Sequence, residues 1–213
     1  MPLKLPLPSI YPITSGKTTP QTTSDDPQFN QILQLVRAAV DAGVPLFQIR
    51  EKLLSGRVLY ELVERALLLT RGSETRLLVN DRSDIARAAG ADGVHLTAQS
   101  LPAAVVRKIY GDEFVIGVST HSVQEAKAAR IAGADFIVFG PVFESASKRA
   151  FGPPQGLDKL REVTRELDGF PVLAIGGITI ENVAACVASG ASGIAGISLF
   201  NNPENYLALR NVL

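Results

Sequence analysis

Short apolar runs alternate along the chain with longer segments in which apolar residues recur at three- and four-residue intervals. Such runs are typical of buried strands, and the longer periodicity is typical of amphipathic helices. We expect eight strands, at residues 10–14, 46–50, 76–80, 93–96, 114–119, 136–140, 171–177 and 193–198. The clearest helical segments lie at residues 29–42, 58–70, 122–132 and 181–189. This alternation predicts parallel βα units.

A weak internal repeat links these units. Residues 89–94, 132–137 and 189–194 each carry a glycine where an expected helix ends and the next strand follows, a position at which glycine readily becomes left-handed. Eight βα units in 213 residues predict an α/β fold with a single domain, a (β/α)8 TIM barrel over residues 1–213. The alternative is an open doubly wound sheet. It is disfavoured because no Gly-x-Gly-x-x-Gly motif opens a helix after a strand.

Two long loops follow the first and sixth expected strands, at residues 15–26 and 141–155. Both lie at C-terminal strand ends, where barrel enzymes carry their catalytic residues. Long loops in compact domains are often functional, so we expect these two to border an active site. Whether the first loop closes over a ligand as a lid is left open.

Composition and charge narrow the classes of partner. Hydrophobic residues make up 46% of the chain and charged residues 20%, and 21 Lys and Arg balance 21 Asp and Glu. A chain without net positive charge lacks the basic surface that nucleic acid or an anionic membrane selects. No segment approaches the length of a membrane span. We therefore expect a soluble protein with neither partner.

The single cysteine, Cys186, bears on the cellular compartment. Alone it can form neither an internal disulfide nor a zinc ligand set, and its apolar helical surroundings favour a core position. The first residues contain no continuous apolar stretch of the kind that a signal peptide requires. These features predict a cytoplasmic protein.

Polar side chains at strand ends are the main sign of chemistry, because a strand covered on both faces is normally apolar throughout. Gln48, Arg50 and Lys52 stand at alternate positions, so they are expected to share one face and present an amide and two cations. The cations could instead be merely solvated. Asn80 and Asp81 end the third strand, where an amide and a carboxylate could bind Mg2+. They could equally end the strand just before a helix.

Later strand ends predict an anion site. The loop after the sixth strand carries two hydroxyls and a cation, Ser145, Ser147 and Lys148, which could bind an anion. Glycines after the seventh and eighth strands, among them Gly177, would let backbone amides approach a phosphate, as is common in these barrels. The ligand is therefore expected to be a phosphorylated small molecule.

The two histidines differ in their expected roles. His121 follows Ser119 at the end of the fifth strand, where it could act as a general acid or base near neutral pH. It could equally cap the next helix. His95 lies within the fourth strand and is interpreted as a hydrogen-bonded interior residue.

Six motifs, taken in order, resemble the thiamine phosphate synthase and thiazole tautomerase superfamily along nearly the whole chain. They are Gln48-Ile49-Arg50-Glu51-Lys52, Asn80-Asp81-Arg82, Gly90-Ala91-Asp92-Gly93-Val94-His95-Leu96, Gly117-Val118-Ser119-Thr120-His121-Ser122, Gly140-Pro141-Val142-Phe143 and Ala174-Ile175-Gly176-Gly177-Ile178-Thr179. The synthase branch joins hydroxymethylpyrimidine diphosphate to a thiazole phosphate and releases pyrophosphate. The resemblance also makes a homodimer a reasonable expectation.

The resemblance to the synthase implies a role for the charged residues. Arg50, Lys52, Asn80 and Lys148 would hold the diphosphate, and Asp81 would bind Mg2+. Cations and metal together would stabilise the departing pyrophosphate, so Arg50 and Lys148 count as catalytic candidates beside His121.

The same resemblance assigns the organic parts of the two substrates. Gln48 and Ser119 would position the pyrimidine side. Gly177, Ile197 and Ser198 would bind the thiazole phosphate, largely through backbone amides. Hydroxyls stand where the family usually shows threonines, at Ser145 and Ser147.

One departure from the synthase pattern leaves alternatives open. The family usually reads His-x-Gly-Gln-x-Asp after the fourth strand, with the aspartate as a second Mg2+ ligand, but residues 95–100 end in Ser100. Loss of this carboxylate is expected to weaken Mg2+ binding. The first alternative is therefore the tautomerase, which isomerises a thiazole phosphate carboxylate without metal and would use His121. A non-catalytic phosphate-binding relative is the second. The diphosphate-binding set favours the synthase.

Overall fold

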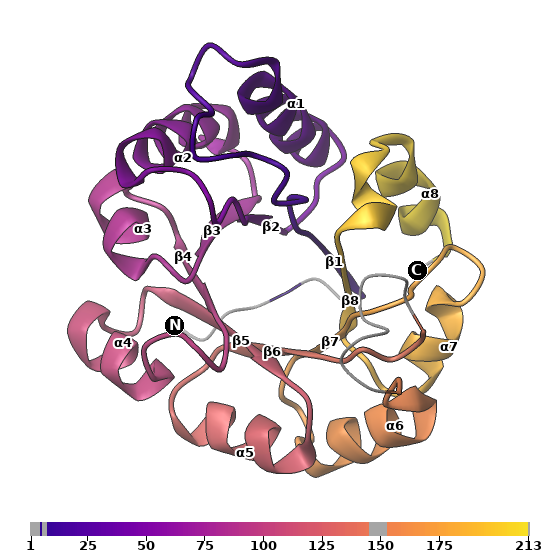
Figure 1. Cartoon of the computed structure of the whole chain (residues 1–213). Helices are drawn as coiled ribbons and strands as arrows, with labels where there is room; N and C mark the ends of the chain where they lie inside the picture. The colour runs from indigo at the N-terminus through magenta and orange to yellow at the C-terminus, as the bar shows by residue number, and fades with distance from the viewer. Residues whose placement is uncertain (1–4, 6–7, 145–152, 213) are drawn as a thin grey trace.

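The computed structural model describes residues 5, 8–144 and 153–212, in which strands and helices alternate around a central barrel (Figure 1). The strands are β1 (Ser9–Pro12), β2 (Leu46–Ile49), β3 (Arg76–Asn80), β4 (Gly93–Leu96), β5 (Val115–Thr120), β6 (Phe136–Phe139), β7 (Val172–Ala174) and β8 (Gly193–Gly196). The helices are α1 (Pro27–Asp41), α2 (Gly56–Thr70), α3 (Ser83–Ala89), α4 (Ala103–Tyr110), α5 (Val123–Ile131), α6 (Gly156–Glu166), α7 (Val183–Ala188) and α8 (Glu204–Val212), with the 3-10 helix η2 (Ser198–Asn201) before α8.

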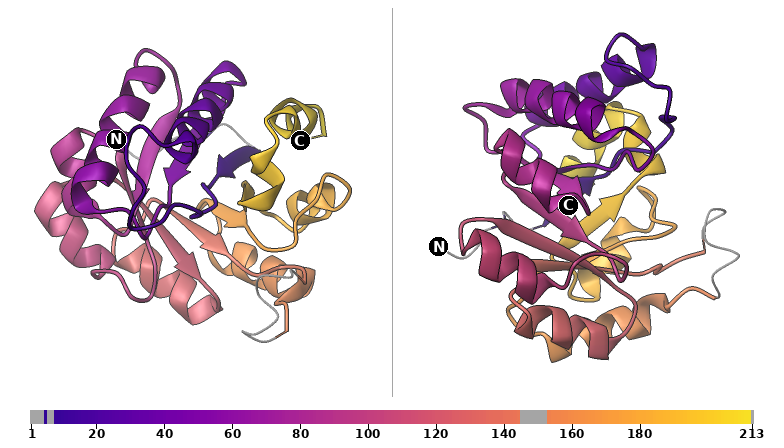
Figure 2. Two further views of the ribbon diagram at one scale, coloured as in Figure 1. Left: turned by 45° about the horizontal axis from the view of Figure 1, so that its top comes forward. Right: turned by 60° about the vertical axis from the view of Figure 1, so that its left-hand side comes forward.

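All paired strands are parallel and form one sheet in the order β1-β8-β7-β6-β5-β4-β3-β2. The sheet closes where Ile13 bridges Gln48 and the Thr14 N–H donates to the Gln48 carbonyl at 3.0 Å. The helices lie around the outside of the barrel, as the turned views also show (Figure 2). The predicted (β/α)8 TIM barrel is confirmed.

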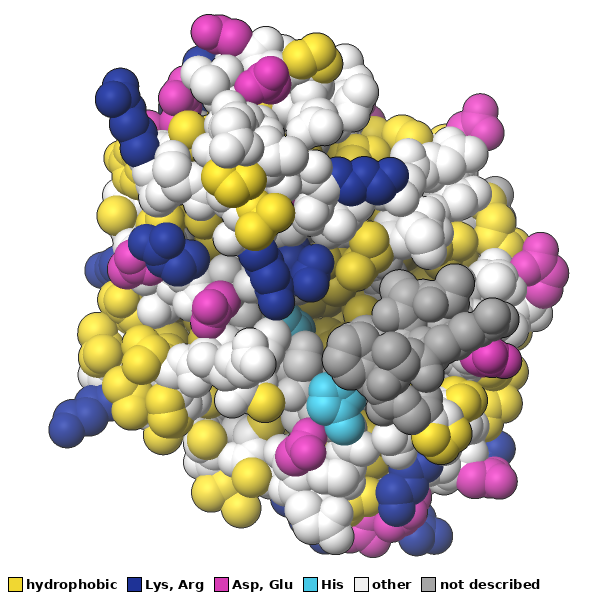
Figure 3. All heavy atoms as spheres, in the orientation of Figure 1, with side chains coloured by type: hydrophobic (Ala, Val, Ile, Leu, Met, Phe, Trp, Pro, Cys, Tyr) yellow, Lys and Arg dark blue, Asp and Glu magenta, His cyan; other side chains and the backbone are white. Residues whose placement is uncertain are grey.

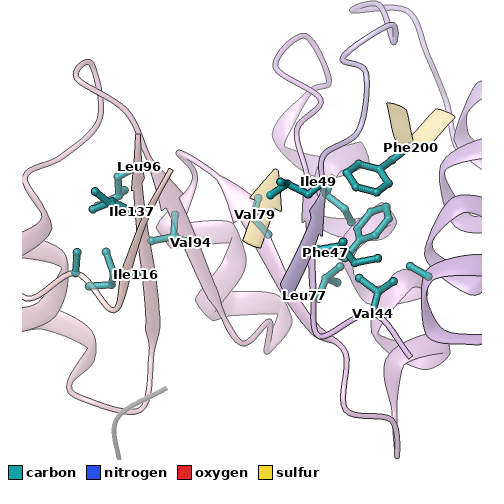
Figure 4. Close-up of a cluster of buried hydrophobic side chains, with 14 of the residues drawn as sticks. Val44, Phe47, Ile49, Leu77, Val79, Val94, Leu96, Ile116, Ile137 and Phe200 are labelled. Carbon is teal, nitrogen blue, oxygen red and sulfur yellow. The ribbon is translucent and has the colours of Figure 1, made fainter. Parts of the chain in front are cut away.

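Alternate strand residues face two separate cores, because successive side chains of a strand point to opposite faces. Leu46 and Leu78 belong to the apolar cluster inside the barrel. Phe47 and Leu77 belong to the larger cluster between strands and helices, part of which is drawn in Figure 4. Gln48, two residues after Leu46, therefore points into the barrel.

The glycines of the internal repeat end helices as predicted. Gly90, Gly133 and Gly190 have φ angles of 84°, 88° and 89°. A left-handed residue at a helix end lets the chain leave the last turn, and glycine does this without a steric penalty. These positions lie at the end of the barrel opposite the C-terminal strand ends.

Cys186 is completely buried in α7, and burial raises the pKa of its thiol to about 11. Its interpretation as a small core residue is confirmed. Across the described ranges, no helix is both long and apolar enough to cross a membrane.

Candidate active site

The C-terminal strand ends surround a polar hollow. The space-filling view is hollowed near its centre, and Lys or Arg and His side chains gather there (Figure 3). The register aligns Asn80 of β3 with His95 of β4, and His95 with Gly117 of β5. Gln48, Asn80 and Ser119, predicted from separate strands, therefore lie around one end of the same barrel.

A series of hydrogen bonds crosses the inside of the barrel beneath this hollow. The Gln48 Nε2 donates to the Tyr11 hydroxyl at 2.9 Å, and that hydroxyl lies 3.3 Å from His95 Nδ1. His95 Nε2 lies 2.9 Å from Ser119 Oγ. Gln48, Tyr11 and His95 are buried, whereas Ser119 is half-buried. The interpretation of His95 as a bonded interior residue is confirmed. Tyr11 was missed, because a tyrosine in an apolar strand is most simply interpreted as core.

Burial determines the protonation states of His95 and Tyr11 in this series. It lowers the pKa of His95 to about 3, an effect to which the nearby positive charge of Arg50 adds. Burial also raises the pKa of Tyr11 well above its usual range, despite the Gln48 hydrogen bond. At neutral pH the imidazole is therefore neutral and the phenol is protonated.

Arg50 stands just beyond β2 and is half-buried. The backbone N–H of Arg50 donates to Thr14 Oγ1 at 2.8 Å, and this bond ties Arg50 to the chain just after β1. A Cβ added to Gly16 would lie 3.1 Å from the Arg50 Nη1, so the loop after β1 passes directly over the guanidinium.

Lys52 departs from the predicted alternation. β2 ends at Ile49 and the chain then turns at Lys52, so the strand face that Gln48 occupies does not extend that far. The reason is Glu51, a 3% exposed carboxylate that sequence analysis did not single out. It accepts hydrogen bonds from the Gly16 and Thr18 N–H groups and from Thr18 Oγ1. Glu51 is therefore buried against the loop after β1, and Lys52 is exposed.

Asp81 has a left-handed backbone conformation. Its φ is 65°, which is uncommon for a residue other than glycine and costs free energy. Its N–H donates to the His95 carbonyl at 2.9 Å, and this bond joins the end of β3 to the end of β4. α3 begins at Ser83, as the alternative interpretation expected, but neither Asn80 nor Asp81 is its N-cap residue.

Few carboxylates at this edge are available to a metal ion. In the part of the chain that the structure describes, no group of three His, Cys, Asp or Glu side chains could hold one. Ser100 closes its own turn by accepting a hydrogen bond from the Thr97 N–H at 2.8 Å. Asp84 pairs with Arg82 at 2.6 Å, and this bond lowers the pKa of Asp84. Mg2+ is often held by one or two carboxylates plus substrate phosphates, so Asp81 fits a Mg2+ ion bound together with a diphosphate.

His121 is exposed beside the hollow, and its ring has a defined orientation. Its Nδ1 lies 2.5 Å from the Gly140 carbonyl. A carbonyl only accepts hydrogen bonds, so Nδ1 carries the proton and Nε2 is the nitrogen that can take up another. The helix-capping interpretation of His121 is wrong, because Ser122 is the N-cap of α5 and accepts from the Glu125 N–H.

The glycines after β7 have a packing role that the sequence did not reveal. A Cβ on Gly177, whose φ is 63°, would lie 2.4 Å from the Glu144 carbonyl oxygen, and a Cβ on Gly176 would lie 2.5 Å from the Pro141 Cβ. Both glycines thus allow the loop after β6 to pack on the loop after β7. Their expected contact with a phosphate stays a prediction.

The remaining predicted residues are placed as follows. Ile197 precedes η2 and is half-buried, and Ser198 is the first residue of η2 and is exposed. Ser145, Ser147 and Lys148 lie outside the described residues.

Comparison with known proteins identifies the family. The model of the thiamine monophosphate synthase family matches residues 18–200. The chain belongs to this family. A putative thiamine-phosphate synthase of Geobacter sulfurreducens is 48% identical over 167 residues, which cover 78% of each chain. The thiamine-phosphate synthase of Roseiflexus castenholzii is 39% identical over 198 residues, covering 91% of this chain and 83% of the relative.

A solved structure agrees with this assignment. Thiamine phosphate pyrophosphorylase from Pyrococcus furiosus superposes with a TM-score of 0.80 at 31% identity, covering 96% of this chain and 95% of the other. As a member of the thiamine monophosphate synthase family, the chain is an enzyme of thiamine biosynthesis and a transferase. The relatives' names agree with the synthase interpretation and not with the tautomerase alternative.

Proposed function

We propose that this enzyme joins hydroxymethylpyrimidine diphosphate to a thiazole phosphate, forming thiamine phosphate and releasing pyrophosphate. The observation that carries the proposal is the set of inward-facing polar groups at the C-terminal strand ends, where Gln48, Arg50, Asn80 and Ser119 surround one hollow. A diphosphate needs cations and N–H or O–H donors, and a pyrimidine ring needs directional hydrogen bonds. An enzyme that never binds a diphosphate would not require this combination.

The chemistry is a displacement at the methylene carbon of the pyrimidine. The bond from this carbon to the diphosphate oxygen breaks, its electron pair leaves with the pyrophosphate, and the thiazole nitrogen supplies the pair for the new bond. Arg50, together with Lys52 and Lys148, would stabilise the charge that develops on the departing oxygens. Gln48 and Ser119 would hold the pyrimidine in place while the bond breaks. No covalent nucleophile is needed.

Asp81 would hold Mg2+ at the diphosphate end of the hollow, where Asn80 would bind the diphosphate itself. The ion would neutralise part of the leaving group's negative charge when bound. The left-handed backbone of Asp81 and its bond to the β4 end hold the carboxylate at the rim of the barrel, which supports this role. Ser100 would leave the ion with fewer protein ligands than the family pattern supplies.

The second substrate would bind at the ends of β7 and β8. Gly177, Ile197 and Ser198 would bind the thiazole phosphate, and Ser145 and Ser147 would add hydroxyls. A cytoplasmic location and a homodimer belong to the same proposal. They are supported by the single cysteine and by the family resemblance, respectively.

Two matched variants test the proposal against the tautomerase alternative. Asn is the appropriate replacement for Asp81, because it tolerates the left-handed conformation while removing the charge. A synthase should lose about 10- to 100-fold in kcat/KM on Asp81→Asn and less on His121→Asn, because the condensation requires no proton transfer by His121. A metal-independent isomerisation of the thiazole phosphate carboxylate that His121→Asn abolishes and Asp81→Asn leaves intact would refute the proposal.

A further inference from the structure

Which atoms donate and which accept in the buried hydrogen bonds inside the barrel follows from the chemistry of Gln48. The Gln48 Nε2 group can only donate, so the Tyr11 oxygen accepts from it at 2.9 Å. The phenol proton is buried and needs an acceptor. His95 Nδ1, 3.3 Å away, is the atom placed to accept it.

The same reasoning fixes the tautomer of His95. A neutral imidazole that accepts at Nδ1 carries its hydrogen on Nε2. Nε2 therefore donates to Ser119 Oγ at 2.9 Å. The serine oxygen is the acceptor in this bond, so its own hydrogen is left to donate to another group. Of the four residues in the series, Ser119 is the half-buried one, at the end of β5 that borders the hollow.

The surrounding packing holds the His95 ring in this position. A Cβ on Gly117 would lie 2.8 Å from His95 Nδ1 and 2.4 Å from Phe136 Cζ, so the glycine makes room for both rings. Tyr11 meets Phe136 edge-on with centroids 5.3 Å apart, and His95 lies 5.7 Å from Tyr11 and 6.1 Å from Phe136. An imidazole wedged among these rings cannot easily rotate to exchange its two nitrogens.

We propose that Tyr11 and His95 are positioning residues that fix the Ser119 hydroxyl as a hydrogen-bond donor toward an acceptor nitrogen of the substrate's heteroaromatic ring. Neither residue needs to touch the substrate for this role. The inference rests on the proposed transferase function, because that function supplies a substrate with such a ring. It adds two residues, absent from the predicted site, that determine which ring edge Ser119 can bind.

Nuclear magnetic resonance tests the tautomer without any activity measurement. In the intact chain labelled with 15N-histidine, ring nitrogen shifts distinguish a protonated from an unprotonated nitrogen. The chain has two histidines, and His121→Asn leaves the signals of His95 alone. The proposal expects an unprotonated Nδ1 and a protonated Nε2 at neutral pH. The opposite tautomer would overturn it.

A kinetic double-mutant cycle tests the consequence. Tyr11→Phe removes only the hydroxyl. It should raise the KM for hydroxymethylpyrimidine diphosphate about tenfold, as expected for one lost hydrogen bond. The KM for thiazole phosphate should stay unchanged. In a Ser119→Ala background, Tyr11→Phe should have no further effect. Tyr60→Phe is the control, because that hydroxyl bonds Glu64 on the surface of α2; it should change neither KM.

Two outcomes would show a merely structural role and overturn the proposal: equal effects of Tyr11→Phe in both backgrounds, or a rise in both KM values. Failure of the proposed function is recognised separately. A folded chain that makes no thiamine phosphate refutes that function and this role with it. A chain that makes product but has the opposite His95 tautomer refutes this role alone.

Discussion

The carboxylate of Glu51 accepts a hydrogen bond from the Thr18 hydroxyl at 2.7 Å, and this contact anchors the loop after β1 to the end of β2. The backbone N–H groups of Gly16 and Thr18 donate to the same carboxylate, at 3.2 and 3.3 Å. The first residues of this loop are therefore fixed over Arg50. Any closing motion of this loop must involve its later residues.

Glu51→Gln should loosen this anchor. The amide presents an N–H2 group toward hydrogen-bond donors, so we expect the free energy of unfolding to fall by about 1–3 kcal/mol. Hydrogen exchange of the Gly16 and Thr18 amides should become faster. Thr18→Val is the matched control, because it removes one of the three bonds and should cost about 1 kcal/mol. Unchanged exchange in Glu51→Gln would show that the anchor does not stabilise the loop.

Two threonines at strand ends should respond oppositely to replacement by valine. Thr120 Oγ1 is buried and, among the described residues, finds no hydrogen-bond partner, so Thr120→Val should raise the free energy of unfolding by about 1 kcal/mol. Thr14 Oγ1 accepts from the Arg50 N–H, so Thr14→Val should lower it by about 1–2 kcal/mol. Urea denaturation of both variants measures the difference. A destabilised Thr120→Val would mean that its hydroxyl has a partner.

His95 should make stability depend on pH in mildly acidic solution. Its pKa is about 3 in the folded chain against an ordinary value of 6.5, so the unfolded chain binds the extra proton first as the pH falls. The contribution of neutral His95 to the free energy of unfolding is fully present above about pH 6.5 and is lost progressively toward pH 3. At pH 5 the free energy of unfolding is lower by about 2 kcal/mol. His95→Gln should lack this part of the slope between about pH 7 and 5. Parallel slopes in the two proteins would contradict a neutral, buried His95.

Ser100→Asp should strengthen the dependence on Mg2+. Aspartate can accept the same Thr97 N–H bond that closes the turn, while it adds a carboxylate beside the proposed ion. The Mg2+ concentration for half-maximal rate should fall on the order of tenfold. Ser100→Asn has a similar shape without charge and should leave it unchanged. If both variants shift it equally, charge is not the cause.

The barrel and its polar end were predictable because they depend on local patterns. Apolar runs, helical periodicity and glycines at helix ends all repeat along the chain, and polar residues such as Gln48 interrupt the strands where the hollow lies. Contacts between distant segments were not predictable. The burial of Glu51, which leaves Lys52 exposed, depends on hydrogen bonds to a loop more than 30 residues earlier in the sequence. The role of Tyr11 in the hydrogen-bond series depends on its contact with His95 of β4, which only the folded barrel brings within reach of β1.

The most direct test of the central claim is product formation by the unaltered chain. Purified protein is mixed with hydroxymethylpyrimidine diphosphate, thiazole phosphate and Mg2+, and pyrophosphate and thiamine phosphate are both quantified. Reactions with a chelator, or without one of the substrates, serve as controls. The proposed function predicts equal amounts of the two products, only with both substrates and with Mg2+ present. Folded protein that binds thiazole phosphate but releases no pyrophosphate would contradict it.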